Sequence, residues 1–192
     1  QLRLRNWAKF PVDPASIDAV LLTHAHLDHS GYLPALVRDG FRGKVHASSA
    51  TVELCEILLK DSGFLQEKDA EYANKHGFSR HKPALPLYTL KDAEDALRHL
   101  QVVPFHERRS LPDGPEILLR RAGHILGAAS IECRWGGARI AFSGDLGRFG
   151  DPSYGMYLYA FPIQQTLQHI SGNSMSLTGM IVLSTIFSVC LG

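Results

Sequence analysis

The chain has 192 residues, with 20 basic and 19 acidic side chains and a formal net charge of +1. This length allows one domain with a sizeable hydrophobic core, and the balanced charge argues against nucleic-acid binding through bulk charge alone. The three cysteines, Cys55, Cys133 and Cys190, contain no CxxC pair and suggest no disulfide framework. We therefore expect a reducing, cytoplasmic compartment.

The first part of the chain alternates apolar runs that predict strands with a short helical segment. Residues 17–22 (IDAVLL) predict a strand that is buried on both faces. Residues 31–39 predict a short helix that Gly40 closes and for which Ser30 is a candidate N-cap. Residues 43–48 predict a second strand. Strand, helix and strand in this order predict a βαβ-like unit.

The middle of the chain is helical and the part that follows is rich in strands. Residues 49–79 predict a helical region punctuated by Gly63 and Gly77, and the two prolines of residues 81–88 predict a loop. Residues 91–100 predict a charged helix with one apolar face. Turn signals then separate four predicted short strands: residues 101–105, 116–122, 129–135 and 138–143.

Residues 152–192 differ in composition from residues 1–151. All charged side chains lie between Arg3 and Asp151, and the tail ends in the apolar run 175–191, which is at the lower limit for a membrane span. We expect the uncharged tail to come from an aberrant or truncated reading frame. A single transmembrane helix and a buried core segment are the alternatives, and we do not expect a membrane partner.

The segment HAHLDH places four metal-ligand side chains at the junction of a predicted strand and helix. His24 and His26 are two residues apart in extended chain, so their imidazoles point the same way. Asp28 and His29 lie where the chain turns into the helix, and they can therefore reach a neighbouring ion. Imidazole and carboxylate are ligands of zinc and similar divalent ions. Surface histidines in a polar loop are the alternative interpretation.

Two further candidate ligands follow predicted strands later in the chain. His124 lies between glycines in RRAGHILGAAS, and Asp145 ends the strand of IAFSGDLGR. Loops that leave strand ends are the usual place for site residues. Taken singly, His124 would be a loop histidine and Asp145 a turn residue; together with HAHLDH they indicate a metal site.

HAHLDH, AGHILGAAS and SGDLGR resemble three successive motifs of the metallo-β-lactamase fold family. Three features are similar to the RNA-processing branch of this family, the β-CASP ribonucleases, which include the mRNA 3′-end cleavage endonuclease. They are the sequence LTHAHLDHSGYLP, the long insert that ends in HKPALPLY, and the sequence GHILGAAS. The resemblance covers roughly residues 2–151. It implies an α/β fold, an αββα sandwich with a dinuclear zinc site at one edge. In this chain we expect the sandwich to be incomplete and to be followed by an atypical uncharged C-terminal tail.

The resemblance also implies roles for the site residues. Asp28 and Asp145 are the expected catalytic residues, and a water or hydroxide between two divalent ions, most simply Zn²⁺, is the expected nucleophile. Two such ions carry four positive charges and the two carboxylates with hydroxide offset three, which suits phosphodiester hydrolysis. The implied metal ligands are His24, His26 and His124 for the first ion, Asp28 and His29 for the second, and Asp145 between them.

The chain departs from the family pattern at both ends. An apolar strand followed by Asp should precede HAHLDH, and residues 1–16 contain only Asp13; losing such a supporting residue weakens metal binding. The β-CASP domain and the last histidine of the second metal should follow Asp145, and the surroundings of His169 do not resemble that motif. The first residue is not Met, so we expect further residues upstream. We therefore expect a fragment with an incomplete second site and impaired activity.

Three functions follow as hypotheses. The first is a metal-dependent RNA endonuclease that acts on single-stranded RNA, in a family whose full-length members allow a homodimer. The second is a hydrolase of small thioesters or lactams on the same fold. The third is a non-catalytic fragment that binds RNA or a partner. Among the other residues, we expect packing or edge roles for His46, core positions for Cys55 and Cys133, and a solvated loop, or a contact with RNA phosphates, at residues 105–109.

Overall fold

The computed structural model describes residues 8–80, 82–111 and 114–146. The chain divides into two compact units, residues 1–122 with 126–145, and residues 123–125 with 146–192. The helices and strands described here belong to the first unit. The predictions for the tail, including the apolar run 175–191, His169 and Cys190, lie outside the described residues, and the domain boundary after residue 151 stays a prediction. Within the described part of the chain, no helix is long and apolar enough to cross a membrane.

A three-stranded parallel sheet carries the start of the chain. It is formed by β1 (Ala19–Leu21), β2 (Lys44–Ala47) and β3 (Leu100–Val102) in the order β1-β2-β3. The β1 and β2 pairing is parallel, which confirms the βαβ-like unit. Burial of β1 on both faces is wrong, because all three of its residues are only half-buried in this edge strand. The third strand comes from the segment predicted at 101–105.

Two short helices, rather than one, connect β1 to β2. They are α1 (Leu27–Ser30) and α2 (Leu33–Arg38), and a 3-10 turn at Pro14–Ser16 precedes β1. Pro34 has no N–H to donate to the Ser30 carbonyl, which favours a break between the two helices. The prediction of Ser30 as an N-cap is also wrong. It ends α1, is fully buried, and donates from Oγ to the Ala25 carbonyl oxygen at 2.9 Å.

The long helix α3 (Ser49–His76) and the helix α4 (Leu90–Leu97) cover the sheet. Ser48 caps α3 through its side chain and Gly77 ends it with a left-handed conformation. Gly63 does not punctuate α3 but lies inside it. A Cβ at this position would lie 2.9 Å from the Thr89 carbonyl oxygen at the start of α4, so the close approach of α4 accounts for the glycine. The predicted charged helix is confirmed, except that it ends before Leu100, which belongs to β3.

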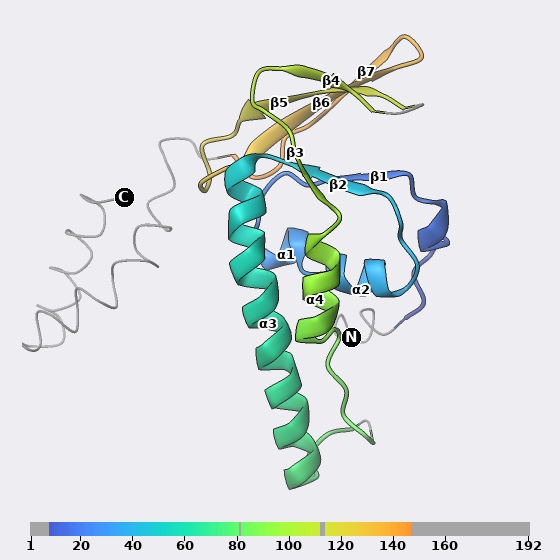
Figure 1. Cartoon of the computed structure of the whole chain (residues 1–192), viewed down its shortest axis with the longest axis vertical. Helices are drawn as coiled ribbons and strands as arrows, with labels where there is room; N and C mark the ends of the chain where they lie inside the picture. Colours follow the sequence, from blue (N-terminus) through green and yellow to red (C-terminus); the bar gives the residue numbers. More distant parts are fainter. Residues whose placement is uncertain (1–7, 81, 112–113, 147–192) are drawn as a thin grey trace, which may run out of the picture. The chain divides into compact units, whose positions relative to one another are not determined.

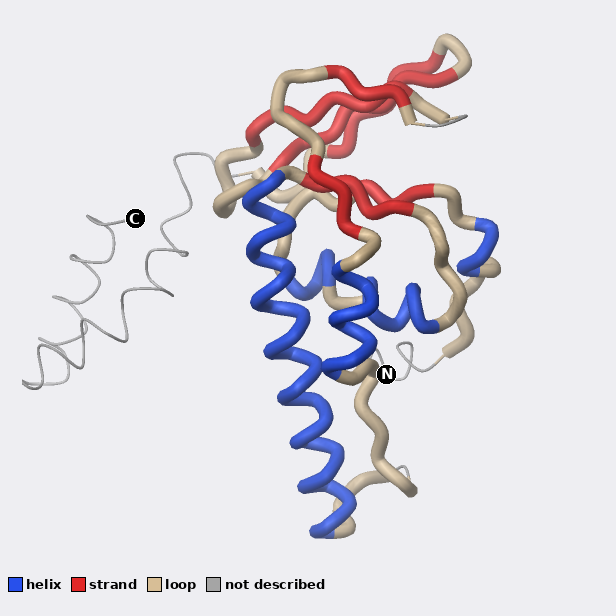
Figure 2. The backbone as a smooth tube through the Cα atoms, in the orientation of Figure 1, coloured by secondary structure: helices blue, strands red, loops and turns tan. Residues whose placement is uncertain are grey.

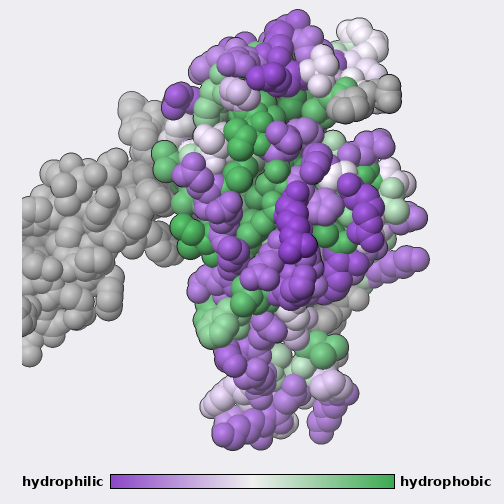
Figure 3. All heavy atoms as spheres, viewed as in Figure 1, coloured by the Kyte–Doolittle hydropathy of each residue, from purple (hydrophilic) through white to green (hydrophobic). Residues whose placement is uncertain are grey.

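One narrow stripe of α3 packs inside the molecule. Four of its five buried residues, Thr51, Cys55, Leu59 and Gly63, recur every fourth position, as expected for one face of a helix, and the fifth is Ala73. Beyond Gly63 most of the helix is exposed, and Figure 3 shows mainly hydrophilic residues in the lower part of the view, where the C-terminal half of α3 lies in Figure 1. Burial of α3 is therefore concentrated in its first half, and Ala73 is its one buried residue beyond Gly63.

A four-stranded antiparallel sheet follows, formed by β4 (Arg108–Ser110), β5 (Glu116–Arg121), β6 (Ala129–Trp135) and β7 (Ala138–Phe142). The predictions of β5, β6 and β7 are confirmed. The solvated loop predicted at 105–109 is wrong in part, because β4 begins there. Arg108 bonds Glu116 at 3.0 Å and Glu132 at 3.4 Å. All residues of β4 are exposed, so it lacks the apolar alternation that marks a half-buried strand.

One part of the hydrophobic core lies between the two sheets, and another part is formed by buried residues of α2, α3 and α4. Val103 and four residues of β5 and β6 form a buried cluster, against which partly buried residues from both sheets pack. Figure 2 shows the strands in two neighbouring layers with the helices on the outer side of the parallel layer, so the described residues form three layers, α, β and β. The predicted α/β class is confirmed. The cluster consists of Val103, Ile117, Leu119, Ala129 and Ile131, packed against Leu21, Phe105, Leu111 and Cys133.

The predicted packing roles of His46 and Cys55 agree with the structure. His46 lies in the central strand β2 rather than at an edge, and burial, with Lys44 nearby, lowers its pKa. Cys55 is fully buried, and this burial raises the pKa of its thiol to about 11. Since the thiolate is the nucleophile, a pKa of about 11 leaves roughly one thiol in a thousand reactive at pH 8.

Cys55 is therefore expected to resist alkylation in the folded chain. With iodoacetamide at pH 8, modification of Cys55 should be at least about 100-fold slower in buffer than in urea, because unfolding restores an ordinary thiol pKa. Peptide mass spectrometry after timed quenching measures the rate at this position alone. Equal rates in buffer and in urea would show that Cys55 is not buried.

Candidate metal centre

His24 is held at the carboxyl end of β1 by contacts on both sides. The Leu22 amide donates to the His46 carbonyl at 2.9 Å, and the Ala129 amide donates to the Thr23 carbonyl at 2.8 Å. The His24 side chain is almost completely buried, with Nδ1 3.2 Å from the Thr23 hydroxyl. The imidazole is therefore fixed by the junction of the two sheets, with its Nε2 edge turned toward His26.

The two imidazoles of the HxH pair approach each other through ring nitrogens. His24 Nε2 lies 3.1 Å from His26 Nδ1, and the rings meet edge to face. Ligand nitrogens about 2.0–2.1 Å from one tetrahedral ion lie about 3.3 Å apart. The spacing of these two atoms therefore fits a shared ion, as the extended HxH pattern predicts.

Asp145 comes after β7 and reaches both ends of the histidine cluster. Its Oδ2 lies 3.8 Å from His24 Nε2, and its Oδ1 lies 3.7 Å from His29 Nε2. The preceding residue, Gly144, approaches Thr23 so closely that a Cβ there would lie 2.9 Å from the Thr23 Cβ. A side chain at position 144 would therefore push the Asp145 loop away from the end of β1.

His124 lies in the loop between β5 and β6. This loop is closed by a hydrogen bond of 3.0 Å from the Ala122 amide to the Ala128 carbonyl. His24, His26, His124 and Asp145 each offer one ligand atom, and these four atoms lie within 4.8 Å of one another. The structure thus brings together four of the six predicted metal ligands in one group of candidate ligand atoms.

Asp28 and His29 stand beside this group. They lie in α1, which is about one turn long, and His29 Nε2 is 3.7 Å from Asp28 Oδ2. The Asp28 side chain is 77% exposed, while that of His29 is 32% exposed. The rings of His24 and His29 have centroids 4.1 Å apart. His29 therefore borders the buried cluster, and Asp28 extends from it toward solvent; the ligand role of each of the six residues stays a prediction.

The start of helix α3 is hydrogen-bonded to the loop that carries His124, and the sequence analysis did not predict this contact. Ser48 Oγ and Thr51 Oγ1 both donate to the Gly127 carbonyl, at 2.6 and 3.0 Å. Gly127 has φ +80°, and a Cβ there would lie 2.5 Å from the Thr51 amide nitrogen. The serine before a helix is a recognisable N-cap signal. Its partner is 79 positions away in the sequence, so no local pattern could reveal it.

Asp13, the one acidic residue ahead of HAHLDH, has a local structural role. Its side chain accepts a hydrogen bond of 3.0 Å from the Ala15 amide and so caps the 3-10 turn before β1. Among the described residues it is not part of the four-residue group of candidate ligands. Its capping bond accounts for the residue without any contribution to metal binding.

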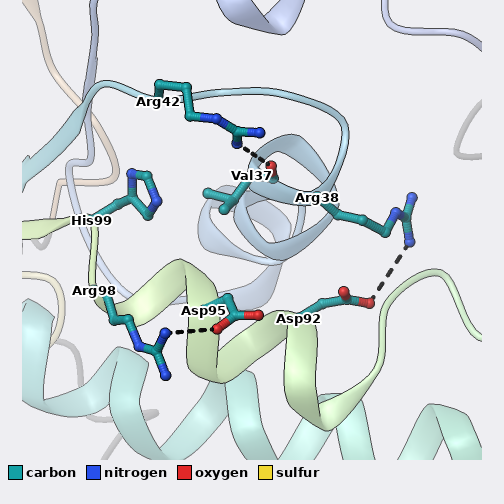
Figure 4. Close-up of a pocket in the computed structure, with 7 residues that line it drawn as sticks. All are labelled: Val37, Arg38, Arg42, Asp92, Asp95, Arg98 and His99. Carbon is teal, nitrogen blue, oxygen red and sulfur yellow. Dashed lines mark hydrogen bonds and ion pairs between the residues drawn. The ribbon is translucent and has the colours of Figure 1, made fainter.

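A cleft of about 470 Å³ lies between α2, α4 and the residues that follow each of them, and none of the predicted site residues lines it (Figure 4). Its charges are largely paired with one another. Arg98 Nη1 lies 3.2 Å from Asp95 and Arg38 Nη1 lies 3.9 Å from Asp92, while Arg42 donates to the Val37 carbonyl at 3.3 Å. Size alone therefore does not identify the functional site, and the histidine cluster is the better candidate.

Comparison with known proteins agrees with the motifs. The chain is 39% identical over 143 residues to Ribonuclease TTHA0252 of Thermus thermophilus, which covers 74% of this chain and 29% of the ribonuclease. It is 32% identical over 132 residues to the Transcription termination factor FttA of Methanococcus maripaludis, covering 68% of this chain and 19% of the factor. The FttA of Pyrococcus abyssi is 33% identical over 132 residues, with 67% and 18% covered.

The chain thus spans less than a third of the length of each of these relatives. The family model described as the metallo-beta-lactamase superfamily matches residues 5–168, which include all six predicted ligands. The resemblance inferred from HAHLDH and the two later motifs is confirmed. The chain belongs to the metallo-beta-lactamase superfamily, whose α/β fold it shares.

Proposed function

We propose that the chain is part of a metal-dependent endonuclease that hydrolyses phosphodiester bonds in single-stranded RNA, and that its own activity is impaired because the second metal site is incomplete. The observation that carries the proposal is the position of the Asp145 carboxylate, with one oxygen toward His24 and the other toward His29. A carboxylate placed in this way suits a ligand shared by two divalent ions. The names of the relatives, a ribonuclease and transcription termination factors, support RNA as the substrate.

The donor set supports ions of the zinc type. Imidazole nitrogens and carboxylate oxygens suit zinc, and iron or manganese accept the same ligands. In this proposal the first ion takes three imidazoles and the second takes fewer protein ligands, one of which, Asp28, is 77% exposed. The second ion is therefore held more weakly. The proposed sets are His24, His26 and His124 for the first ion, Asp28 and His29 for the second, and Asp145 for both.

Divalent ions bound here would lower the pKa of water toward neutrality and offset the charge that develops on phosphate. The residues of this chain supply the geometry and the balance of charge. Asp28 and Asp145 are the proposed catalytic residues, because their two carboxylates neutralise only part of the charge of two ions and leave the site attractive to a phosphodiester. The buried position of His24 keeps the cluster in one arrangement. Cytoplasmic localisation and a homodimer stay predictions.

RNA cleavage by the full chain tests the proposal. A labelled single-stranded RNA should be cut at internal positions after loading with Zn²⁺ or Mn²⁺ and left intact after chelation. His26→Ala and Asp28→Ala should each lower the rate by more than about 100-fold, since loss of even a supporting residue can cost 10–100-fold. His76→Ala is the matched control, because His76 is exposed near the end of α3 and should leave the rate unchanged.

The same assay separates the alternative functions. Thioester and β-lactam substrates offered in parallel should not be turned over. Cleavage that persists in both the His26 and the Asp28 variants would contradict the proposed site, and turnover of a thioester or lactam without RNA cleavage would favour the small-molecule hydrolase. Stoichiometric RNA binding without cleavage, with metal bound, would favour the non-catalytic hypothesis.

A further inference from the structure

A second pocket opens beside Asp28. Its volume is about 300 Å³, at the lower end of the range for small-ligand pockets. It lies between α1, the middle of α3 and the segment that leads into α4. Because one of its walls is the side chain proposed to hold the second ion, a group bound in this pocket would lie next to the proposed metal centre. The lining residues are Leu27, Asp28, Gly31, Tyr32, Ser62, Gln66, Leu87 and Tyr88.

Tyr88 brings a buried hydroxyl to this pocket. The residue is 1% exposed, and its hydroxyl oxygen makes no hydrogen bond with the residues that the structure describes. Burial raises the pKa of Tyr88, and the neighbouring side chains of Ser62 and Gln66 offset part of this rise. A buried polar group without a partner destabilises a folded protein, so a ligand that bonds to it is a natural explanation.

The polar groups beside Tyr88 are oriented by the fold. Gln66 Nε2 donates to Ser62 Oγ at 3.1 Å, and Gln66 Oε1 accepts from the Leu87 amide at 3.0 Å. Ser62 therefore keeps a hydroxyl proton to donate, and Gln66 keeps a second amide proton. The pocket wall combines hydroxyl and amide groups that can bond to a ligand in a defined direction.

The chemistry of the lining selects among ligands. One carboxylate and no Lys or Arg line the pocket, so it does not favour a phosphate group. Leu27 and Leu87 provide apolar surface and the ring of Tyr32 provides aromatic surface, with its centroid 5.5 Å from that of the Phe10 ring on which it stacks. Proteins recognise unpaired bases by combining aromatic surface with hydrogen bonds to the base edge. A heterocyclic base fits this combination better than a sugar phosphate does.

We propose that this pocket binds one unpaired nucleobase of the RNA next to the bond that is cleaved, with Tyr88, Ser62 and Gln66 bonding to its edge. The inference rests on the proposed function for the identity of the substrate, but the pocket itself is defined by its own residues. Because the base enters beside Asp28, the pocket fixes the position of the neighbouring phosphodiester relative to the metal ligands.

Binding of mononucleotides to the zinc-loaded full chain tests the pocket without cleavage. The four nucleoside 5′-monophosphates are compared with ribose 5-phosphate, which has the same phosphate and no base. At least one nucleotide should bind about 10-fold more tightly than ribose 5-phosphate. Tyr88→Phe should weaken that nucleotide about 3- to 10-fold, the effect of one neutral hydrogen bond, and should leave ribose 5-phosphate unchanged. Tyr72→Phe is the matched control, because Tyr72 is 59% exposed on α3.

The thermal midpoint shows whether Tyr88→Phe acts through folding. Removing an unpartnered buried hydroxyl should leave the midpoint equal or higher, so weaker nucleotide binding would reflect lost recognition. Equal binding of all four nucleotides and ribose 5-phosphate, or full affinity in Tyr88→Phe, would overturn the proposal. RNA cleavage without base-dependent binding refutes the pocket and leaves the reaction standing. Base-dependent binding that Tyr88→Phe weakens, without RNA cleavage, supports the pocket and refutes the reaction.

Discussion

Asp145→Asn is expected to lower RNA cleavage by more than about 100-fold and to reduce the number of tightly bound metal ions per chain. The substitution keeps the shape of the side chain but removes its negative charge and one of its two ligand oxygens. Since the two oxygens lie 3.8 Å from His24 Nε2 and 3.7 Å from His29 Nε2, one of the proposed ions would lose its ligand oxygen and the other would keep only a neutral amide oxygen. Metal analysis after dialysis, with the cleavage rate measured on the same sample, gives both quantities.

Asp69→Asn is the control for this prediction, because Asp69 is exposed on α3. It should leave both the metal content and the cleavage rate unchanged. Thermal unfolding of the metal-free forms should show similar midpoints for the two variants and the natural chain. Wild-type metal content and cleavage in Asp145→Asn would show that this carboxylate does not hold the ions.

Gly127→Ala is expected to destabilise the chain more than Gly137→Ala does, by about 1–3 kcal/mol, the typical effect of overpacking. Both glycines have φ +80°, so the cost of placing a side chain in this conformation is common to the two variants. A Cβ at Gly127 would lie 2.5 Å from the Thr51 amide nitrogen, whereas one at Gly137 has nothing within 4 Å. Urea unfolding of the two variants measures the difference.

The same pair of variants tests how the His124 loop is positioned. The Gly127 carbonyl accepts hydrogen bonds from Ser48 and Thr51, and a displaced loop would lose them. Gly127→Ala should therefore also weaken zinc binding, while Gly137→Ala, in the turn between β6 and β7, should not. Equal stability and equal zinc affinity in the two variants would argue that α3 does not fasten this loop.

Much of the fold and the site was accessible from the sequence because the relevant patterns are local. The apolar runs of β2, β5, β6 and β7 are short strands bounded by turn signals. The HxH spacing predicted that His24 and His26 share one side of an extended segment, and their ring nitrogens are 3.1 Å apart. The family could be inferred because its motifs consist of ligands at fixed spacing.

The features that were missed depend on contacts between distant residues. The strand β4 carries charged residues, and its partner β5 makes it a strand. Gly63 looks like a helix breaker, but the close approach of α4 requires it inside α3. The Gly127 contact with Ser48 and the pocket beside Tyr88 join segments that are far apart in the chain. Such contacts follow from tertiary packing and leave no periodic pattern in the sequence.

The most direct test of the central claim, a metal centre built from histidine and aspartate, is X-ray absorption spectroscopy of the chain loaded with one equivalent of zinc. We predict a shell of nitrogen and oxygen at about 2.0–2.1 Å, with the outer scattering of several imidazoles and no sulfur. His26→Ala should reduce the imidazole scattering. A zinc–sulfur distance of about 2.3 Å, or a shell of oxygen alone, would contradict the assignment.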